Sequence, residues 1–317
     1  MRKQTRPASF ADLLVVGGGS ARLDRIAGLL DWAPLEALLG DVYASGCGRP
    51  AYAPLVHLRI LLLQSWYGLS DPGMEEALGD RLSFRRFAGL GLDERVPDHS
   101  SISRFRSLLA SRGLAERVFG EVVRQLDARQ VTIRQGTLID ATVIEAAAAE
   151  PARQRGGGRA KADPDARWVK RPDGSARFGY KLHAAVDQGT GIVRRACITP
   201  ANIADVDHGH HLVIGDEQAV YADKGYVGPR LRERLQAAGI RNRVQHKAQK
   251  NRPLSARQRL RNTLIGRIRG RIEGVFGALK RSYGLARMRF MGLLKNQAAT
   301  LITLTSWNLA RAADQLG

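Results

Sequence analysis

Cysteine is almost absent from the chain. Only Cys47 and Cys197 occur among 317 residues, too few for a disulfide framework or for a cysteine cluster around zinc. We therefore expect a protein of a reducing compartment, the cytoplasm, whose fold is held by its own hydrophobic core. A chain of this length has room for about two domains.

Long apolar runs are also missing. The longest, around Leu58 to Leu63, is far shorter than the roughly 20 residues needed to span a bilayer. The first residues are basic, but Asp12 and three glycines interrupt the apolar stretch that a secretory signal requires. Neither a secretory signal nor a membrane span is expected.

Acidic residues are scarce relative to basic ones. Thirty Asp and Glu stand against fifty Lys and Arg, which gives a net charge of +20 and a sequence pI near 10.9. This excess is typical of proteins that bind polyanions. Nucleic acid is favoured over a membrane as partner, because the sequence shows no lipidation motif or basic amphipathic anchor.

The first part of the chain, residues 1–130, is expected to be all-helical. From about Pro54 onward, apolar residues recur at helical spacing. Asp98 and Ser100 are expected to cap a helix, and Asp71-Pro72-Gly73 is expected to break one. We expect this domain to serve DNA binding or dimerisation.

Two arrangements of these helices are open. In a helix-turn-helix, Ser101, Arg104 and Arg106 would face DNA. A plain helical bundle fits the same spacing of apolar residues equally well.

The second part, residues 131–317, has the pattern of an α/β domain. Strands are expected at 137–144, 178–187, 192–199 and 218–223, which are rich in apolar and β-branched residues. A helix is expected near 204–213, with further helices after the fourth strand. This order predicts a mixed sheet flanked by helices. Between the first two strands, the Gly- and Arg-rich segment 150–177 is expected to be a mobile, basic loop.

Two aspartates stand out in this second part. Asp140 lies inside an expected strand, although Asp is depleted in strands and costly to bury as an anion. Either a bound cation or a neighbouring Arg explains such a residue. Asp223 ends an expected strand, where ligands collect in α/β sheets. A plain turn-forming role fits Asp223 as well.

A third acid, Glu273, lies in a long amphipathic helix. Arg269, Glu273 and Lys280 fall in one stripe beside the apolar face of this helix. The alternative is a simple Arg269–Glu273 ion pair, which contributes only about 0.3 to 0.5 kcal/mol. Four glycines line another side of the helix, at positions 266, 270, 274 and 277, and predict close approach by DNA or by a partner backbone.

These residues together resemble a known family. Arg269-x3-Glu273-x6-Lys280 is similar to the signature helix of bacterial insertion-sequence transposases of the DDE type. The runs around Asp140 and Asp223 resemble that family's first two acidic motifs, and the closest group is the insertion-sequence family numbered five. One departure is Gly266, where that signature often has Tyr.

The resemblance implies a ribonuclease-H-like catalytic domain at 131–317. It implies that Asp140, Asp223 and Glu273 hold two Mg²⁺ ions, which Mn²⁺ can replace, for DNA cleavage and strand transfer. The expected partners are the terminal inverted repeats of the element and target DNA, bound by a homodimer or larger assembly at the bacterial nucleoid. The expected DNA contacts are Lys280, Arg269, Arg267, Arg271, Tyr226 and Lys224, together with Arg104 and Arg106.

The dense basic segment 230–289 supports phosphate binding, which gives affinity and salt dependence rather than sequence choice. A solvated basic face is its alternative interpretation. Two other functions stay open: a nuclease of the same fold that cuts without joining, and a catalytically silent DNA-binding regulator derived from a transposase.

Overall fold

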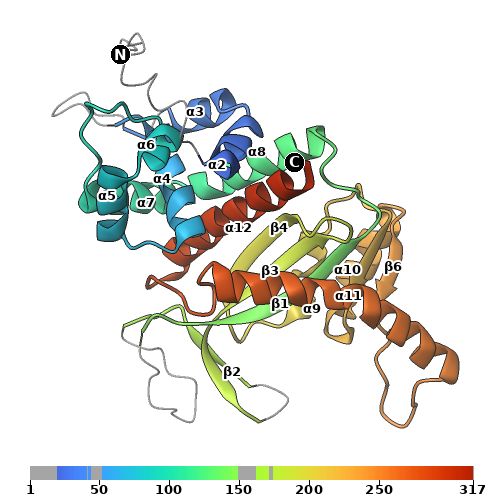
Figure 1. Cartoon of the computed structure of the whole chain (residues 1–317). Coiled ribbons are helices and arrows are strands. Elements are labelled where there is room, and N and C mark those ends of the chain that lie inside the picture. Colours follow the sequence, from blue (N-terminus) through green and yellow to red (C-terminus); the bar gives the residue numbers. More distant parts are fainter. Residues whose placement is uncertain (1–19, 41, 44–51, 149–161, 171–173, 317) are drawn as a thin grey trace.

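The computed structural model describes residues 20–40, 42–43, 52–148, 162–170 and 174–316. In Figure 1 a group of helices lies beside a twisted sheet, and the long helix α11 (Ala256–Ser282) runs across one face of that sheet. The chain thus has an N-terminal helical region followed by an α/β region. Cys47 and residues 150–161 of the expected basic loop lie outside the described residues.

The N-terminal region is helical, as predicted. Its helices are α2 (Ala21–Gly28), α3 (Ala33–Leu39), α4 (Pro54–Tyr67), α5 (Asp71–Asp80), α6 (Leu82–Ala88), α7 (His99–Ser111) and α8 (Leu114–Ala128). The predicted cap Asp98 is confirmed, because its side chain accepts a hydrogen bond from the Ser101 N–H at 2.6 Å. The other expected cap, Ser100, lies inside α7. The expected break at Asp71 is the start of α5, since proline suits the first turn of a helix and Ser70 caps it.

The α/β region contains one mixed sheet. Its strands are β1 (Thr137–Glu145), β2 (Arg167–Lys170), β3 (Ala176–Asp187), β4 (Val193–Pro200), β5 (Ala219–Ala222) and β6 (Arg241–Val244). β3 pairs antiparallel with β1, β2 and β4, whereas β5 pairs parallel with β1 and β6. The strands predicted from apolar runs, β1, β3, β4 and β5, are therefore confirmed.

Two strands were not predicted. β2 lies within the segment 150–177 that was expected to be a mobile loop, and it pairs with the first residues of β3. This part of the segment is fixed further by Asp163, which is buried and accepts hydrogen bonds from the Tyr180 hydroxyl and the Gly292 N–H. The other missed strand, β6, is the polar run Arg-Asn-Arg-Val at the edge of the sheet.

Helices cover both faces of the sheet. α11 and α12 (Leu293–Leu316) share one core with Leu182 of β3. On the other face, α10 (Pro229–Ala237) and the 3-10 turn η2 (Gly209–Leu212) pack on Ile139 and Ala185. The helix expected near 204–213 is shorter than predicted: one turn, α9 (Asp205–His208), followed by η2. The sheet with its helices is the expected ribonuclease-H-like fold.

The last helix, α12, joins the two regions. It lies between the helical group and the sheet in Figure 1. The indole Nε1 of Trp66 in α4 donates to the Ser306 carbonyl of α12 at 2.8 Å. On the opposite side, Asn308 exchanges two hydrogen bonds with the backbone of Val193 in β4. The hydrophobic core is consequently continuous from the N-terminal helices to the sheet. No described helix has the length and apolarity required to cross a bilayer.

Candidate active site

Asp140 and Asp223 occupy matching positions on neighbouring strands. In the parallel register of β1 and β5, Leu138 pairs with Tyr221. Continuing this register by two residues brings Asp140 level with Asp223, which directly follows β5. Alternate residues of a strand share a face, and Leu138 and Tyr221 both belong to the core that α11 covers. The two carboxylates therefore lie on the α11 side of the sheet.

Asp140 is largely buried. Burial raises the pKa of its carboxyl to about 6, while the positive charge of Arg269 and the Ala141 N–H, which donates at 2.9 Å, act in the opposite direction. The negative charges of Asp223 and Asp205 add to the increase. A desolvated carboxylate close to other acids gains most from a neighbouring cation.

Asp223 has a structural role as well as its place in the site. Its side chain caps the 3-10 turn η3 (Lys224–Tyr226) and accepts a hydrogen bond from the Gly225 N–H at 2.7 Å. The turn-forming alternative considered from the sequence is thus realised. One carboxylate oxygen is held by this turn, which fixes the direction of the side chain.

Helix α11 supplies the third acid. It begins at a capping box in which Ser255 and Gln258 exchange hydrogen bonds. Ile272 and Phe276 bury its apolar face, and the helix packs on β1 and β5. Glu273 lies beside this face and is exposed, with 65% of its side chain accessible. The helix therefore places Glu273 near Asp140, since both contact Arg269.

Arg269 links two of the three acids. Its Nη1 donates to Asp140 Oδ2, and its Nη2 donates to Glu273 Oε1 at 3.2 Å, one helical turn away. Both alternatives raised from the sequence, an Arg beside Asp140 and an Arg269–Glu273 pair, are present together. Arg269 was expected to contact DNA, whereas here it neutralises carboxylates, so a DNA contact would require it to leave them.

A fourth acid, Asp205 at the start of α9, was missed. Its charge raises the pKa of both Asp140 and Tyr226. Asp205 accepts a hydrogen bond from Lys181 Nζ at 2.9 Å. The sequence did hold one signal for this pair: Lys181 is a charged residue near the middle of strand β3, where most neighbouring residues are apolar.

Two of the residues expected to contact DNA are buried in this structure. Arg106 is 9% exposed, and its Nη1 donates to Asp71 Oδ2 at 2.9 Å inside the helical region. Tyr226 is 1% exposed. Its ring packs on Gly209, where a Cβ atom would come within 2.8 Å of the ring.

The remaining expected DNA contacts are accessible. Lys224, Arg267 and Arg271 are exposed, and so is Arg104 on α7. Lys280 is half-buried near the end of α11. Apart from Arg104, these cations come from η3 and α11, the same elements that carry Asp223 and Glu273.

The donor set suits a hard divalent cation, but no closed ligand cluster is present. Carboxylate oxygens are the ligands that Mg²⁺ prefers, and burial of Asp140 raises its pKa, which favours a cation beside its charged form. Within the described ranges, however, no group of three His, Cys, Asp or Glu side chains is arranged to hold a metal ion. The guanidinium of Arg269 lies where Asp140 and Glu273 converge.

Comparison with known proteins agrees with this geometry. Residues 17–108 match the family described as Transposase domain (DUF772). Residues 131–309 match the family described as Transposase DDE domain. No solved structure matches the chain significantly. The second match covers more than half of the sequence and includes all three acids, so the chain belongs to the DDE transposase family.

Proposed function

We propose that the chain is a DNA transposase of an insertion sequence whose catalytic residues are Asp140, Asp223 and Glu273. The observation that carries this proposal is the convergence of the three acids. Asp140 and Asp223 are level on adjacent strands, and Arg269 bridges Asp140 and Glu273. Arg269 thus ties Glu273 to Asp140, and Asp140 has Asp223 level with it on the neighbouring strand β5.

In this proposal, the three carboxylates would hold two Mg²⁺ ions, with Mn²⁺ as a substitute. Bound there, divalent cations activate the attacking oxygen and stabilise charge on the phosphorus and the leaving oxygen. The chain's own residues would position the scissile phosphate and keep other charged groups away from the carboxylates. Water attacks in end cleavage, and the freed 3′ hydroxyl attacks target DNA in joining.

Arg269 has a defined task in this scheme. While it neutralises Asp140 and Glu273, it opposes the entry of another cation. Leaving them frees the carboxylates and turns the guanidinium toward DNA phosphate, which it can bind with two parallel hydrogen bonds. Arg267, Arg271, Lys224 and Lys280 would neutralise further phosphates.

The finer assignments rest on the sequence motifs. The signature spacing of Arg269, Glu273 and Lys280 supports a transposase of the insertion-sequence DDE type, with the family numbered five as the proposed group. The large positive charge supports binding of terminal inverted repeats and target DNA in the bacterial cytoplasm, at the nucleoid. A homodimer or larger assembly follows from the need to act on two DNA ends.

The test is incubation of the full chain with linear DNA that carries the element ends, with Mg²⁺, Mn²⁺ or EDTA. Cleavage at the ends and insertion into a second DNA, each requiring the metal, are expected. Cleavage without insertion would favour the nuclease of the same fold. DNA binding with no cleavage under any metal condition would leave the silent regulator, which the presence of all three acids disfavours.

A further inference from the structure

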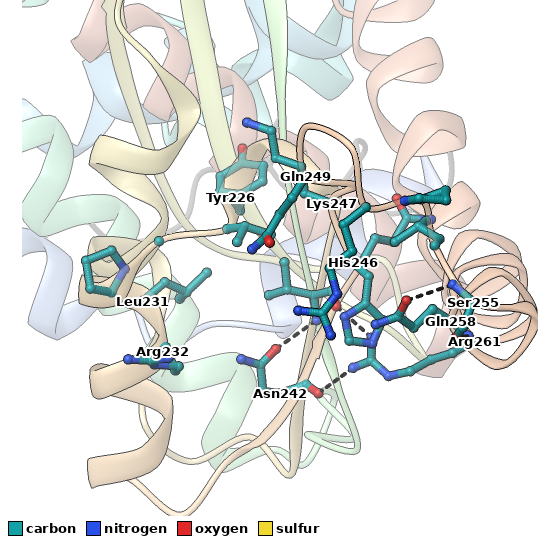
Figure 2. A pocket seen from close by; sticks show the side chains of 18 residues that line it. Tyr226, Leu231, Arg232, Asn242, His246, Lys247, Gln249, Ser255, Gln258 and Arg261 are labelled. Carbon is teal, nitrogen blue, oxygen red and sulfur yellow. Dashed lines mark hydrogen bonds between the residues drawn. The ribbon is translucent and has the colours of Figure 1, made fainter.

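A large groove lies beside the acids, toward the edge strand β6. It has a volume of about 1230 Å³ and is lined by residues of η3, α10, β6, the segment 245–254 and the first turns of α11. Figure 2 shows these side chains surrounding an open space. Sites for one small molecule usually have about 300–1000 Å³, so this groove is larger than a single ligand needs.

The groove is lined by cations and contains no acid. Arg232, Lys247 and Arg252 are exposed at its walls. Their side chains form no hydrogen bond or ion pair with any residue that the structure describes. None of the lining residues is Asp or Glu. Such a surface attracts an anion with several charges, because nothing within the groove offsets its potential.

A fourth cation is fixed in orientation. Arg261 donates hydrogen bonds to the carbonyls of Val244 at 2.8 Å and Asn242 at 3.0 Å. Burial and the nearby charge of Arg243 lower the pKa of this guanidinium. Arg261 therefore holds β6 against α11 and adds positive potential to the groove floor.

Uncharged side chains in the groove can recognise bases. The backbone of His246 is clamped by Asn262, through hydrogen bonds of 2.8 and 3.0 Å. The ring of His246 forms no hydrogen bond with the described part of the chain, and neither does the amide of Gln249. Figure 2 draws His246 among the side chains that line the groove. A planar ring and free amides suit stacking on a base and hydrogen bonding to its edge.

The groove adjoins the acids. Tyr226, three residues after Asp223, forms part of its lining. Gln245, another lining residue, donates its backbone N–H to Ala222 at the end of β5, at 3.0 Å. The groove therefore begins within three residues of Asp223 along the chain, next to the end of β5.

We propose that this groove binds one unpaired strand of DNA, whose phosphates contact Arg232, Lys247 and Arg252 and one of whose bases stacks on His246. This rests on the proposed function, since the strand would be the one whose phosphate lies at the acids. A duplex fits less well, because its paired bases cannot reach the ring and amides inside the groove. Electrostatic tracking of the backbone combined with stacking is how proteins bind single strands.

Binding is tested by fluorescence anisotropy in EDTA, with a labelled twelve-nucleotide oligothymidine and a duplex of the same length. The variant R232A/K247A/R252A is expected to bind the single strand at least about tenfold more weakly than the wild type. The slope of log K against log salt concentration should become shallower by about 2 for this variant, because each single-strand phosphate contact contributes about 0.7 to it. The duplex should lose much less affinity.

The matched control is R25A/R117A/R129A, which removes three exposed cations from the helical region and changes the net charge equally. It should retain single-strand affinity within about threefold. His246→Ala should weaken single-strand binding by about tenfold, and His246→Phe should restore it because a ring is again present. Far-ultraviolet circular dichroism confirms that each variant is folded.

Equal loss by both triple variants, or equal loss for duplex and single strand, would overturn the proposal. Failure of His246→Phe to restore binding would overturn the stacking contact. These measurements need no metal and no cleavage, so they are independent of the proposed function. A protein that binds the strand in this groove yet never cleaves DNA would refute the transposase activity and leave the groove standing.

Discussion

Arg269 and Asp140 are brought together from a helix and a strand more than a hundred residues apart, and the guanidinium of Arg269 donates to Asp140 Oδ2. A single positive charge therefore compensates a carboxylate that burial has made a weaker acid. The same guanidinium also reaches Glu273. Arg269 thus pairs with two of the three acids that we propose to be catalytic.

Replacing Arg269 with alanine should strengthen divalent-metal binding in the absence of DNA. Without the guanidinium, Asp140 and Glu273 keep their full negative potential for another cation. Loss of a pair of this kind is worth about 1 kcal/mol, or about fivefold in affinity. Mn²⁺ titration followed by electron paramagnetic resonance measures it. The control is Arg271→Ala, which removes the same charge two residues further along α11 and leaves these acids untouched. An equal increase in Mn²⁺ affinity in this control would refute the idea that Arg269 competes with the metal.

Replacing Asp223 with alanine should abolish cleavage and preserve DNA binding. Loss of several kcal/mol of charge stabilisation corresponds to about a thousandfold slower cleavage. Initial rates on end-containing DNA and a parallel binding assay measure the two effects. Glu233→Ala, at an exposed position on α10, serves as the control and should cleave at the wild-type rate. Cleavage by Asp223→Ala at a normal rate would eliminate this acid from the active site.

Arg106 should prove to be a structural residue. It is buried and paired with Asp71, and the pKa of Asp71 is lowered despite the opposing effect of its burial, through hydrogen bonds from Arg106 and Gln64. Arg106→Ala leaves a carboxylate without its partner, which costs about 3 to 5 kcal/mol of unfolding free energy. Arg104→Ala, exposed on the same helix, should change it by less than about 0.5 kcal/mol. Urea denaturation compares them, and similar values for the two would contradict the burial of Arg106.

Arg106 also shows where sequence reasoning reaches its limit. Helical spacing predicted α7 and its cap Asp98, but the partner of Arg106 lies 35 residues earlier, in α5. Helical periodicity predicts which residues of a helix lie on its apolar face and which lie on its polar face. It does not say which charged residue meets an opposite charge on another helix.

The strands show the same contrast between local and distant causes. β1, β3, β4 and β5 were predictable because apolar β-branched runs fit a buried sheet. β6 was not, because its Arg-Asn-Arg-Val sequence is polar and pairs on one side only, at the edge. β2 was hidden in a Gly- and Arg-rich segment and depends on pairing with β3.

The acids were predictable one by one, but their neighbours were not. Asp140 and Asp223 could be found as aspartates in or after apolar strands, and Glu273 by its place on an amphipathic helix. Asp205 follows a short turn without a strong pattern. Its proximity to Asp140 arises only when α9 packs against η2 and η3.

The stability of the helical region should fall in acid because of His57. This residue is 2% exposed and stacks on Phe105, with ring centroids 5.1 Å apart. Burial lowers its pKa to about 4, although the charge of Asp98 acts in the opposite direction. Between pH 6.5 and 4 the unfolded chain binds the proton that the folded chain rejects, so stability decreases as pH falls.

The expected loss from His57 is about 3 kcal/mol between pH 7 and pH 4. His57→Phe keeps a ring beside Phe105 and removes the titration. Denaturation curves at both pH values should show the wild type losing about 3 kcal/mol more than this variant. Comparison with the variant matters because buried His183, whose pKa is lowered to about 3, contributes in the same direction. An identical pH response in the two proteins would exclude His57 as a source.

The glycines of α11 give the last prediction. At Gly270 and Gly274 no atom lies within 4 Å of an added Cβ, so nothing within the described chain requires glycine there. Each Gly→Ala change should stabilise the helix by about 0.5 to 1 kcal/mol. If DNA or a partner backbone approaches this side of α11, the added methyl groups should also slow cleavage, by about tenfold for the double variant.

Thermal denaturation and initial cleavage rates separate these two effects of the α11 changes. Gly120→Ala in α8, where an added Cβ also meets no atom within 4 Å, should give the same stabilisation with unchanged cleavage. Glycine lowers the stability of a helix, and nothing inside the protein requires glycine at these positions near Glu273. The expected reason for these glycines is therefore a molecule that approaches α11 from outside. Normal cleavage by G270A/G274A would show that this space is not used by DNA or by a second protomer.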